Sequence, residues 1–539
     1  MRALWDDWSR TCPKKFSPED QEKTWSSFGR DYDGPRITVG TIYHLAHEAG
    51  WSDPASALTN VSDEAPLVKP KDGVDFSQRL RTDANNALMF LDLFGENLRF
   101  VEKWGCWLAW NGSRWVEVSD LALLPLARQA TEEILKWAVS LPAAADREAW
   151  IKHAVATQKD ARLRAMIILA KGEARARIEP DALDADLWLL GCPNGTRDLR
   201  TGKLLEAWRK DLITKQISVA LNPAAECPRW LELLNWVTQG DKELVAFLTA
   251  LAGYVLTGEV REEVLCALVG GGANGKSTFL MTLCDLMGDY AGKARSDLLV
   301  SEQGAKGAAS PDVAALQGKR LVVVNETEDG CLLSEARVKD IVSNEPIAAR
   351  RLYRDPFMFR PTHKTILATN HRSRVRGTDN GIWRRLALVP FNATVEEADK
   401  VPDFRERILK PELQGILNWA VRGCSNYVRD GLRQPSSVRQ ATAAYRAEMD
   451  TVSQWIDERT ERDPTAATPL AALFVDYSTW AESERTPHLG KRRFGDELER
   501  QGFVADRATK GGRVRRGLML KSILAARVVP FRPLDARVT

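Results

Sequence analysis

Residues 270–278, GGGANGKST, hold the side-chain types and the spacing needed to bind a nucleoside triphosphate. They match the pattern Gly-x-x-x-x-Gly-Lys-Ser and follow an apolar run, residues 264–269, that is typical of a buried strand. In such a loop the backbone N–H groups surround the phosphates, the following helix adds partial positive charge, the lysine neutralises phosphate oxygens and the serine hydroxyl reaches Mg²⁺. The sequence therefore predicts a site for ATP and Mg²⁺ formed by Gly270, Gly271, Gly272, Ala273, Asn274, Gly275, Lys276, Ser277 and Thr278.

A second predicted strand ends in carboxylates. Residues 319–328, KRLVVVNETE, give a buried apolar run that leads to Glu326 and Glu328. An acid at the carboxyl end of such a strand holds the water shell of Mg²⁺ and polarises the attacking water. We assign this role to Glu326, which would share the metal with Ser277, and we keep Glu328 as a second candidate.

Polar side chains at and after a third predicted strand complete the expected catalytic set. Residues 364–370, KTILATN, end in Asn370, which we expect to orient the hydrolytic water or to sense the γ-phosphate. Arg384 and Arg385 follow, where they suit an arginine finger that stabilises transition-state charge on the γ-phosphate of a neighbouring subunit. The alternative for this pair is a surface cluster of ion-paired side chains.

Two basic segments predict contacts with DNA. Residues 347–357 place Arg351, Tyr353 and Arg354 around a turn, which suits a contact that follows the backbone of single-stranded nucleic acid. Between residues 491 and 521, ten Lys or Arg residues stand against four acids, although the net charge of the whole chain is only +3. This segment either forms a solvated basic face or binds duplex or forked DNA through Lys491, Arg492, Arg513, Arg515 and Arg516.

Turn signals and periodicity divide the 539 residues into several predicted parts. We expect a small helical module at residues 1–52, a linker at 53–82, a mixed α/β domain at 83–221, an α/β nucleotide domain at 228–430 and a winged helix at 445–525. Asn111-Gly112, between aromatic and β-branched residues, predicts a hairpin in the mixed domain. The tryptophans beside it could stack on bases, but aromatic residues at strand spacing favour a core role; they are Trp104, Trp107, Trp110 and Trp115.

The composition, with 44% hydrophobic and 28% charged residues, is ordinary for a soluble globular protein. No apolar run approaches the roughly 18 residues of a membrane span, and the first residues contain no apolar signal segment. The eight cysteines are scattered without a Cys-x-x-Cys pair. We therefore expect reduced, mostly buried thiols, no zinc site, no membrane association and a cytoplasmic location.

The ordered set GGGANGKS, LVVVNETE, KTILATN and IWRRL resembles the superfamily-3 helicases, in particular the phage and plasmid primase-helicases related to the poxvirus primase-helicase. NGSRW and NGTRDLRTG look like the domain that precedes the ATPase in that family, ARRLYRDPFMF looks like the stretch before its sensor strand, and the first 52 residues look like its primase carboxyl-terminal module. The resemblance implies a multidomain α/β fold with an AAA+ phosphate-loop core. It also implies a hexameric ring that hydrolyses ATP between neighbouring subunits and translocates on single-stranded DNA, usually 3′ to 5′.

Carried over to this chain, the family pattern assigns Lys276 and Ser277 to the phosphate loop, Glu326 to the second-strand acid and Asn370 to the sensor. It assigns the finger to Arg384 or Arg385 and places the basic turn of residues 351–354 near a DNA-contacting hairpin tip. No paired-aspartate strand precedes residue 52, so the resemblance does not extend to a primase catalytic domain.

We therefore expect a replicative DNA helicase of a phage, prophage or plasmid that uses ATP and Mg²⁺ on single-stranded and forked DNA. A separate primase or polymerase is a candidate partner. Two alternatives stay open. One is a bifunctional primase-helicase, and the other is an ATP-switched origin-binding protein that loads another helicase without unwinding DNA itself.

Overall fold

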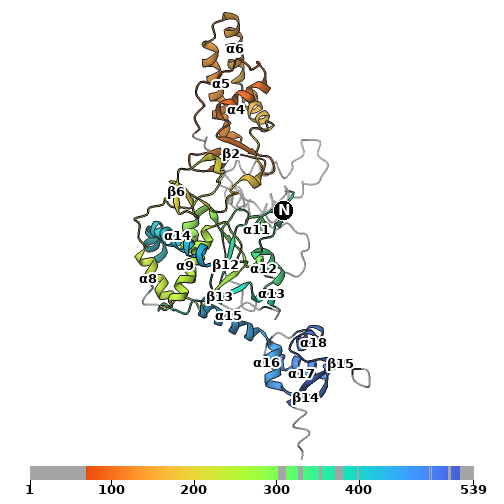
Figure 1. The fold of residues 1–539 in the computed structure, drawn as a ribbon. Helices are drawn as coiled ribbons and strands as arrows, with labels where there is room; N and C mark the ends of the chain where they lie inside the picture. Colours follow the sequence, from red (N-terminus) through yellow and green to blue (C-terminus); the bar gives the residue numbers. More distant parts are fainter. Residues whose placement is uncertain are drawn as a thin grey trace, which may run out of the picture. The chain divides into compact units, whose positions relative to one another are not determined.

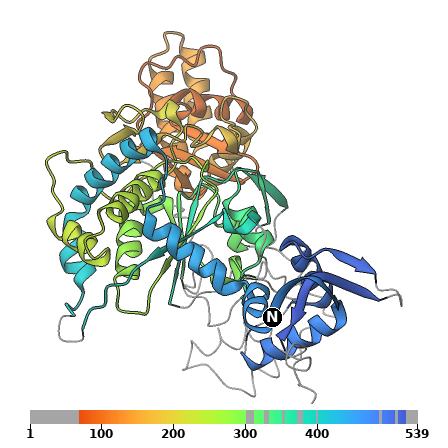
Figure 2. The same cartoon turned by 60° about the horizontal axis from the view of Figure 1, so that its bottom comes forward.

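The computed structural model describes residues 68–300, 311–325, 332–350, 355–370, 375, 380–396, 400–484, 486, 489–507 and 512–521. The chain divides into two compact units, Met1–Val61 and Ser62–Thr539, and all described residues belong to the second. The helical module predicted at residues 1–52 lies outside the described residues. Figures 1 and 2 show the elements in two views.

The first described elements are helices packed with a small antiparallel sheet. Helix α4 (Asp83–Phe94) begins where the Thr82 hydroxyl accepts a hydrogen bond from a backbone N–H. The sheet has the order β1-β2-β3, and the helices that follow it share one apolar core with α4. These elements are β1 (Leu98–Val101), β2 (Cys106–Trp110), β3 (Trp115–Val118), α5 (Leu124–Val139), α6 (Ala144–Thr157) and α7 (Asp160–Lys171).

The hairpin predicted at Asn111-Gly112 is confirmed as the turn between β2 and β3. Gly112 has a φ of +99°, a backbone conformation that glycine adopts without steric cost. Trp107 and Trp115 on the two strands are almost completely buried, so the core interpretation of these tryptophans is confirmed for this pair.

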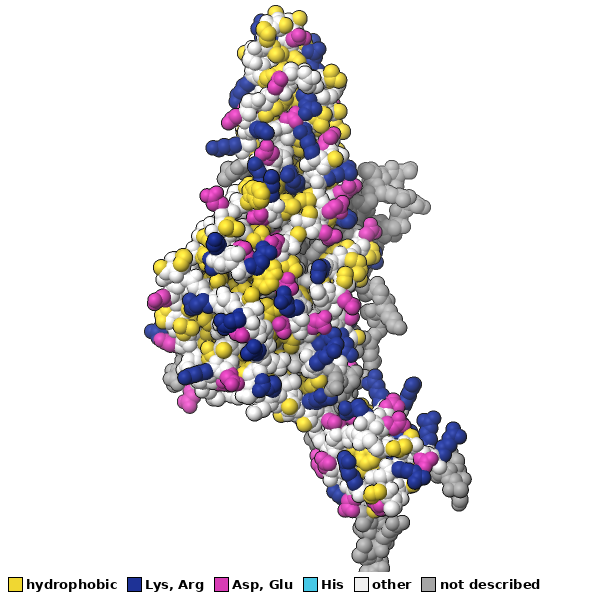
Figure 3. All heavy atoms as spheres, viewed as in Figure 1, with side chains coloured by type: hydrophobic (Ala, Val, Ile, Leu, Met, Phe, Trp, Pro, Cys, Tyr) yellow, Lys and Arg dark blue, Asp and Glu magenta, His cyan; other side chains and the backbone are white. Residues whose placement is uncertain are grey.

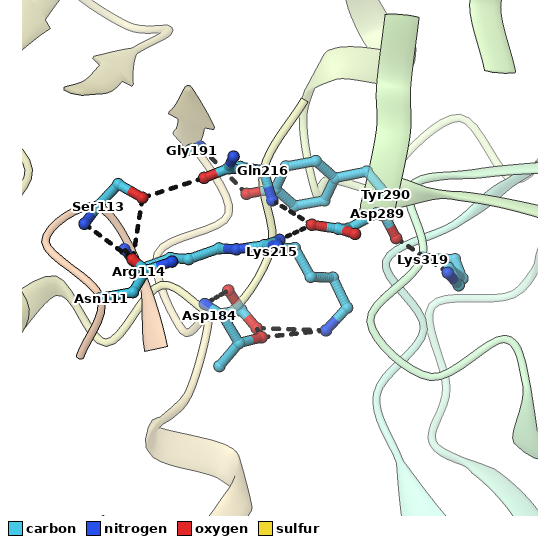
Figure 4. Close-up of polar contacts among 11 residues, drawn as sticks. Asn111, Ser113, Arg114, Asp184, Gly191, Lys215, Gln216, Asp289, Tyr290 and Lys319 are labelled. Carbon is cyan, nitrogen blue, oxygen red and sulfur yellow. Dashed lines mark hydrogen bonds and ion pairs between the residues drawn. The ribbon is translucent and has the colours of Figure 1, made fainter. Parts of the chain in front are cut away.

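A second antiparallel sheet, β4-β5-β6, follows; polar contacts from β4, from the β2–β3 turn and from residue 216 reach the predicted nucleotide domain (Figure 4). It consists of β4 (Leu189–Cys192), β5 (Gly195–Asp198) and β6 (Lys203–Leu205). Arg114 forms an ion pair with Asp289, and the Asp289 carboxylate also accepts the Gln216 N–H at 3.1 Å. The Tyr290 hydroxyl accepts the Gly191 N–H at 3.1 Å. Asp289 and Tyr290 come directly after α10 (Lys276–Met287), so these contacts reach the helix that begins at the phosphate loop.

A five-stranded parallel sheet with the order β13-β7-β12-β9-β8 forms the centre of the predicted nucleotide domain. Its strands are β7 (Leu265–Val269), β8 (Ala291–Ala294), β9 (Leu321–Asn325), β12 (Lys364–Thr369) and β13 (Leu386–Pro390). They are almost continuously apolar, as expected for parallel strands that are covered on both faces. The three predicted strands of this domain are confirmed, and β12 lies between the other two.

Alternate side chains of these strands enter two different apolar clusters. Cys266, Val323 and Ile366 lie in the cluster built with α8 (Pro228–Val237), α9 (Lys242–Leu256), α10 and α14 (Leu413–Asp430). Leu265, Val322 and Leu367 lie in the cluster on the opposite face. That second cluster also contains residues of α12 (Glu335–Val342), α13 (Asn380–Trp383) and α15 (Ser436–Met449).

Helix α15 belongs to the same core, although it lies beyond the predicted end of the nucleotide domain at residue 430. The ring of Tyr445 lies 5.2 Å from that of Trp383, centroid to centroid, and the Thr442 hydroxyl accepts the Leu388 N–H of β13 at 3.0 Å. Two short strands, β10 (Ile347–Arg350) and β11 (Pro356–Phe359), form a separate antiparallel ribbon. The short helix α11 (Pro311–Ala314) precedes β9.

Two buried cations lie at the amino ends of β9 and β12. Arg320 donates to the carbonyls of Leu256 and Leu189, and its guanidinium lies 4.4 Å from the centroid of a tyrosine ring. Lys364 donates to the Thr257 carbonyl and lies 4.9 Å from the ring of Tyr254. Burial holds the pKa of Lys364 well below its usual value. Backbone carbonyls and tyrosine rings therefore surround the Arg320 guanidinium and the Lys364 amine.

The last described elements are α16 (Thr451–Arg459), β14 (Thr460–Pro469), α17 (Leu470–Ser483), α18 (Lys491–Arg500), β15 (Ala505–Arg507) and β16 (Arg513–Leu520). The strands form an antiparallel sheet with the order β14-β16-β15. Trp455, Tyr477 and Phe494, from the three helices, are fully buried in one apolar cluster. Helix α18 is followed directly by the antiparallel strands β15 and β16, and β14 pairs with β16 on its other side.

Six cysteines lie within the described residues, and none of these six forms a disulfide. Burial raises the pKa of the Cys266 thiol to about 12, so this thiol stays protonated near neutral pH. Among the helices of the described ranges, none has the length and apolar character required to cross a bilayer.

Candidate nucleotide site

The phosphate loop occupies the connection between β7 and α10. β7 ends at Val269 and α10 begins at Lys276, so the strand, loop and helix lie in the order that the motif requires. Gly272 and Gly275 have φ values of +100° and +81°, and Ala273 has +46°. A Cβ atom on Gly275 would lie 2.7 Å from a methyl of Val237, so only glycine fits between the loop and α8.

The Lys276 ammonium is held by oxygens from three segments. It donates to the Gly270 carbonyl at 2.8 Å, to Oδ1 of Asn274 at 2.9 Å and to Oδ1 of Asn370 at 3.0 Å. The residue is only 4% exposed. Because an ammonium group is a compact charge with three donors, these oxygens keep the buried lysine solvated in the absence of phosphate.

A cavity of about 380 Å³ opens at this position. Its walls come from the phosphate loop and from the carboxyl ends of β9 and β12, which lie at the same edge because the strands are parallel. The lining residues are Gly272, Ala273, Asn274, Gly275, Lys276, Ser277, Thr278, Asn325, Ala368, Thr369 and Asn370. The structure thus brings the predicted phosphate loop and Asn370 together beside the end of the second strand.

The donors at this edge fit a Mg²⁺ ion that binds together with phosphate. The Ser277 side chain is exposed in the cavity wall, and a hydroxyl with phosphate oxygens and waters is a usual environment for Mg²⁺. Asn325, the last residue of β9, is exposed at the cavity. Glu326 and Glu328, the predicted acids, come next in the chain but lie outside the described residues.

The two arginines predicted as a finger have different environments. Arg385 is largely buried, pairs with Glu263 at 3.0 Å and donates to the Gly381 carbonyl at 3.1 Å. The neighbouring Arg384 is exposed. Arg385 is therefore engaged by contacts within its own chain. The sequence predicts either arginine as the finger; the structure leaves Arg384 as the candidate that a neighbouring subunit could reach.

Both arginines precede β13, which runs parallel to β7 with Leu386 opposite Leu265. The phosphate loop leaves the other end of β7. Four residue steps along a strand span roughly 13 Å. Arg384 thus lies at the sheet edge opposite to Lys276 of the same chain.

Of the basic turn predicted to contact single-stranded DNA, the structure describes the two flanking strands. Arg350 pairs with Pro356 across the β10–β11 ribbon, so residues 351–354 connect a hairpin. Arg351, Tyr353 and Arg354 themselves lie outside the described residues.

Lys and Arg side chains gather over the carboxyl-terminal helices and strands, interspersed with acids (Figure 3). A groove of about 1090 Å³ runs between α18 and the β15–β16 strands. Lys491, Arg492 and Arg513 line it and are exposed, as the predicted DNA contacts require. Arg516 is also exposed and pairs with Asp506 at 2.6 Å.

The assignment of Arg515 as a DNA contact is corrected by its burial. The residue is 4% exposed, donates to the Gly495 carbonyl at 2.9 Å and pairs with Glu499 at 3.0 Å. It joins α18 to β16. Arg515 and Arg516 are successive residues of β16, so their side chains point to opposite faces of the strand, and only Arg516 is exposed.

Three family profiles match the chain. "D5 N terminal like" matches residues 87–239, "Family of unknown function (DUF5906)" matches 268–385, which includes the phosphate loop, and "Primase C terminal 2" matches 1–46.

Curated viral proteins match over longer stretches. "Putative helicase L207/L206" of Acanthamoeba polyphaga mimivirus is 23% identical over 544 residues, which cover 90% of this chain and 53% of that protein. "Putative primase C962R" of African swine fever virus (isolate Tick/Malawi/Lil 20-1/1983) is 28% identical over 332 residues, which cover 57% of this chain and 34% of that protein. The chain is thus similar to D5-like primase-helicases, both in the matched profiles and in its viral relatives.

The chain spans about half of the mimivirus protein and about a third of the swine fever virus protein. "Putative helicase 022R" of Frog virus 3 is 24% identical, over 47% of this chain and 28% of that protein. Among solved structures, the C-terminal region of NrS-1 (305-718) matches with a TM-score of 0.45 at 10% identity, and the match covers 80% of this chain and 98% of that one.

Some features of the candidate site were not found by reading the sequence. The side-chain role of Asn274 was missed because the motif leaves that position open, and a polar residue just before Gly-Lys-Ser was the available signal. Thr369 and Ala368 line the cavity only because β12 lies next to β7, which a sequence pattern does not reveal.

Proposed function

We propose that this chain is an ATP-dependent replicative DNA helicase of a phage, prophage or plasmid, which works as a hexameric ring on single-stranded DNA. The observation that carries the proposal is the meeting of Lys276, Asn370 and the carboxyl end of β9 around one cavity. A phosphate loop with its lysine, a polar residue on a neighbouring strand and a second strand that leads to acids are the parts with which P-loop enzymes hydrolyse nucleoside triphosphates. The parallel sheet with helices on both faces fits an AAA+ core.

Each residue at the cavity has a defined part in this proposal. Backbone N–H groups of the loop bind the phosphates, and Lys276 exchanges the oxygen of Asn370 for phosphate oxygens. Bound Mg²⁺ supplies charge neutralisation at the phosphates, and the Ser277 hydroxyl is placed to hold it. Glu326, the residue after Asn325, takes up the proton of the attacking water or orients it, and Asn370 helps to position that water.

Arg384 is the proposed finger. It is exposed and belongs to the sheet edge opposite to its own phosphate loop, so it would act on the triphosphate of an adjacent subunit. Arg385 supports the segment from within through Glu263. Hydrolysis would then require assembly, which is the expected behaviour of a ring that moves along a strand.

Two elements are proposed to contact DNA. The β10–β11 ribbon presents its tip, residues 351–354, to a single strand, and exposed basic residues beside it fit a backbone contact. The α16–β14–α17–α18–β15–β16 order supports the proposal of a winged helix, with α18 and the β15–β16 strands bordering the groove lined by Lys491, Arg492 and Arg513. Phosphates of duplex or forked DNA are the expected ligands of these cations.

The test combines three measurements on purified protein: ATP hydrolysis with and without single-stranded DNA, displacement of a labelled strand from forked DNA, and imaging of assemblies by negative stain. ATP-dependent strand displacement, with a preference for a 3′ loading strand, supports the proposal. ATP hydrolysis and duplex binding without any displacement would instead identify an origin-binding loader.

A bifunctional primase-helicase is the second candidate, favoured by the match of residues 1–46 to a primase C-terminal profile and by a viral relative named as a primase. Primer synthesis on a single-stranded template with ribonucleotides or deoxyribonucleotides tests it. Product formation by this chain alone would establish that activity, whereas its absence beside active helicase would assign primer synthesis to a partner.

A further inference from the structure

The side-chain amide of Asn274, inside the phosphate loop, makes two contacts of opposite kind. Its Oδ1 accepts from the Lys276 ammonium at 2.9 Å, and its Nδ2 donates to the Phe391 carbonyl at 3.1 Å. The residue is only 3% exposed. The orientation of the amide follows from chemistry, because an ammonium only donates and a carbonyl only accepts.

The segment 391–395, which follows β13, also holds the loop through its backbone. The Phe391 N–H donates to the Val269 carbonyl at 2.8 Å, before the loop, and the Val395 N–H donates to the Ala273 carbonyl at 2.8 Å, within it. A Cβ atom on Gly270 would lie about 2 Å from both Nδ2 of Asn274 and the Phe391 carbonyl oxygen (2.1 and 2.2 Å). The loop, Asn274 and segment 391–395 are therefore packed without spare space.

We propose that Asn274 is a positioning residue of the nucleotide site, which fixes the Lys276 ammonium and fastens the phosphate loop to segment 391–395. The inference rests on the proposed ATPase function. It assigns Asn274 no contact with the reacting atoms. Asn274 acts through Lys276. A lysine side chain that is already held at one position loses less conformational freedom when it binds phosphate.

The proposed role requires a side-chain amide at position 274, because the group must both accept and donate a hydrogen bond. An aspartate at position 274 would keep an oxygen for Lys276, but its second oxygen would face the Phe391 carbonyl, and its charge would lie beside the phosphates. A leucine has a similar size but neither donates nor accepts, so it would release Lys276 and leave the Phe391 carbonyl without this partner. The two substitutions therefore separate the effect of charge from the loss of both hydrogen bonds.

Asn194 offers a matched control. Its side chain makes the same two-way bridge, accepting the Leu221 N–H at 2.9 Å and donating to the Leu221 carbonyl at 3.0 Å, but it lies outside the set of residues that line the nucleotide cavity. Asn194→Asp thus removes the donated hydrogen bond and Asn194→Leu removes both, at a more exposed position away from the cavity.

The experiment measures the affinity for a fluorescent ATP analogue, kcat and KM of ATP hydrolysis, and Tm without nucleotide. The proteins compared are wild type, both Asn274 variants, both Asn194 variants and Lys276→Ala. We expect at least tenfold weaker nucleotide binding in Asn274→Asp and at least a tenfold lower kcat in Asn274→Leu. The Asn194 variants should match wild type in kcat and affinity even where their Tm falls. A purely structural role of Asn274 would lower Tm and leave kcat and affinity of the folded protein unchanged.

Two outcomes separate this inference from the proposed function. Wild type that binds no nucleotide, or binds it equally after Lys276→Ala, would overturn the ATPase assignment itself. Binding that depends on Lys276 but stays within twofold of wild type in both Asn274 variants would overturn the inference alone. Should the variants not fold, hydrogen exchange on wild type still decides: the Phe391 and Val395 N–H groups must be protected without nucleotide, and exchange at unprotected rates would also overturn it.

Discussion

The Nζ atom of Lys276 lies 3.0 Å from Oδ1 of Asn370, a residue 94 positions later in the chain. The contact exists because β7 and β12 are neighbouring parallel strands in a register that places Thr369 opposite Val269. The residues that follow the two strands must then meet at the same edge. Nucleotide phosphates entering the cavity would compete with Asn370 for this ammonium, so the amide is released at the moment when the phosphates bind.

Lys276→Ala should abolish ATP hydrolysis while the protein stays folded. The side chain contacts loop and strand-end oxygens and contributes little to the apolar clusters, so its loss removes charge from the phosphate site rather than packing. ATPase rate and Tm are the measurements. The exposed Lys242→Ala is the matched control and should behave as wild type. A folded Lys276→Ala protein with normal turnover would disprove the site assignment.

Arg384→Ala and Arg385→Ala should fail in different ways. Loss of an arginine finger costs about 10³–10⁵ in rate, so Arg384→Ala should lose turnover at nearly unchanged stability. Arg385→Ala removes the buried partner of a half-buried pair and should lower the free energy of unfolding by about 1–2 kcal/mol. ATPase assays and denaturant unfolding distinguish the two.

Mixing two inactive variants gives a more specific test of the role of Arg384. Lys276→Ala subunits keep their arginine and Arg384→Ala subunits keep their phosphate loop, so mixed assemblies contain some complete sites. Activity should return when subunits exchange. Full activity of Arg384→Ala alone would refute the finger.

Replacing Lys491, Arg492 and Arg513 together with Ala should weaken binding to forked DNA. Each lost phosphate contact lowers the slope of log affinity against log salt by about 0.9. The control removes the same charge through the exposed Lys136, Lys152 and Lys159 of the amino-terminal helices and should leave the slope unchanged. Equal slopes in all three proteins would favour the solvated basic face.

Arg515→Ala gives a different prediction for the same domain. Because Arg515 is buried between α18 and β16, its loss leaves the Gly495 carbonyl and Glu499 without this partner and should lower Tm. Its effect on the salt slope of DNA binding in the folded fraction should be small.

Lys319 should make stability depend on pH in the alkaline range. Burial, helped by the nearby charge of Lys215, lowers the pKa of Lys319 to about 8 from about 10.5. Between these values the unfolded chain keeps a proton that the folded chain has lost, so the free energy of unfolding rises with pH. The rise is at most roughly 3 kcal/mol, from about 1.4 kcal/mol per pKa unit. It is measured as wild type minus Lys319→Met by denaturant unfolding, and a difference that stays flat from pH 7 to 10.5 would contradict it.

The sequence was most informative where a local pattern determines local structure. The apolar run before Gly270, the glycine spacing and the Asn111-Gly112 turn each restrict a few consecutive residues, and the structure has the predicted strand, loop and hairpin there. Lys276 and Asn370 were assigned to one site by the same kind of pattern. That they touch depends on strand order, which only the folded chain defines.

The sequence could not tell which of two neighbouring arginines is exposed, because exposure depends on the surrounding structure. Arg384 and Arg385 are adjacent and chemically identical, yet one is exposed and the other pairs with Glu263, because the turn before β13 directs them differently. Arg515 and Arg516 differ in the same way because strand side chains alternate. A count of basic residues cannot separate such neighbours.

Strand β12 lies between β7 and β9, so two hydrogen-bonded strand spacings separate the strand that leads into the phosphate loop from the strand that leads to Glu326. Each spacing is about 4.7–4.9 Å, which gives a gap of roughly 9–10 Å. Backbone hydrogen bonds set this width, and loop side chains do not enter into it. The loop sequences can therefore differ between relatives while the distance between the carboxyl ends of β7 and β9 stays the same.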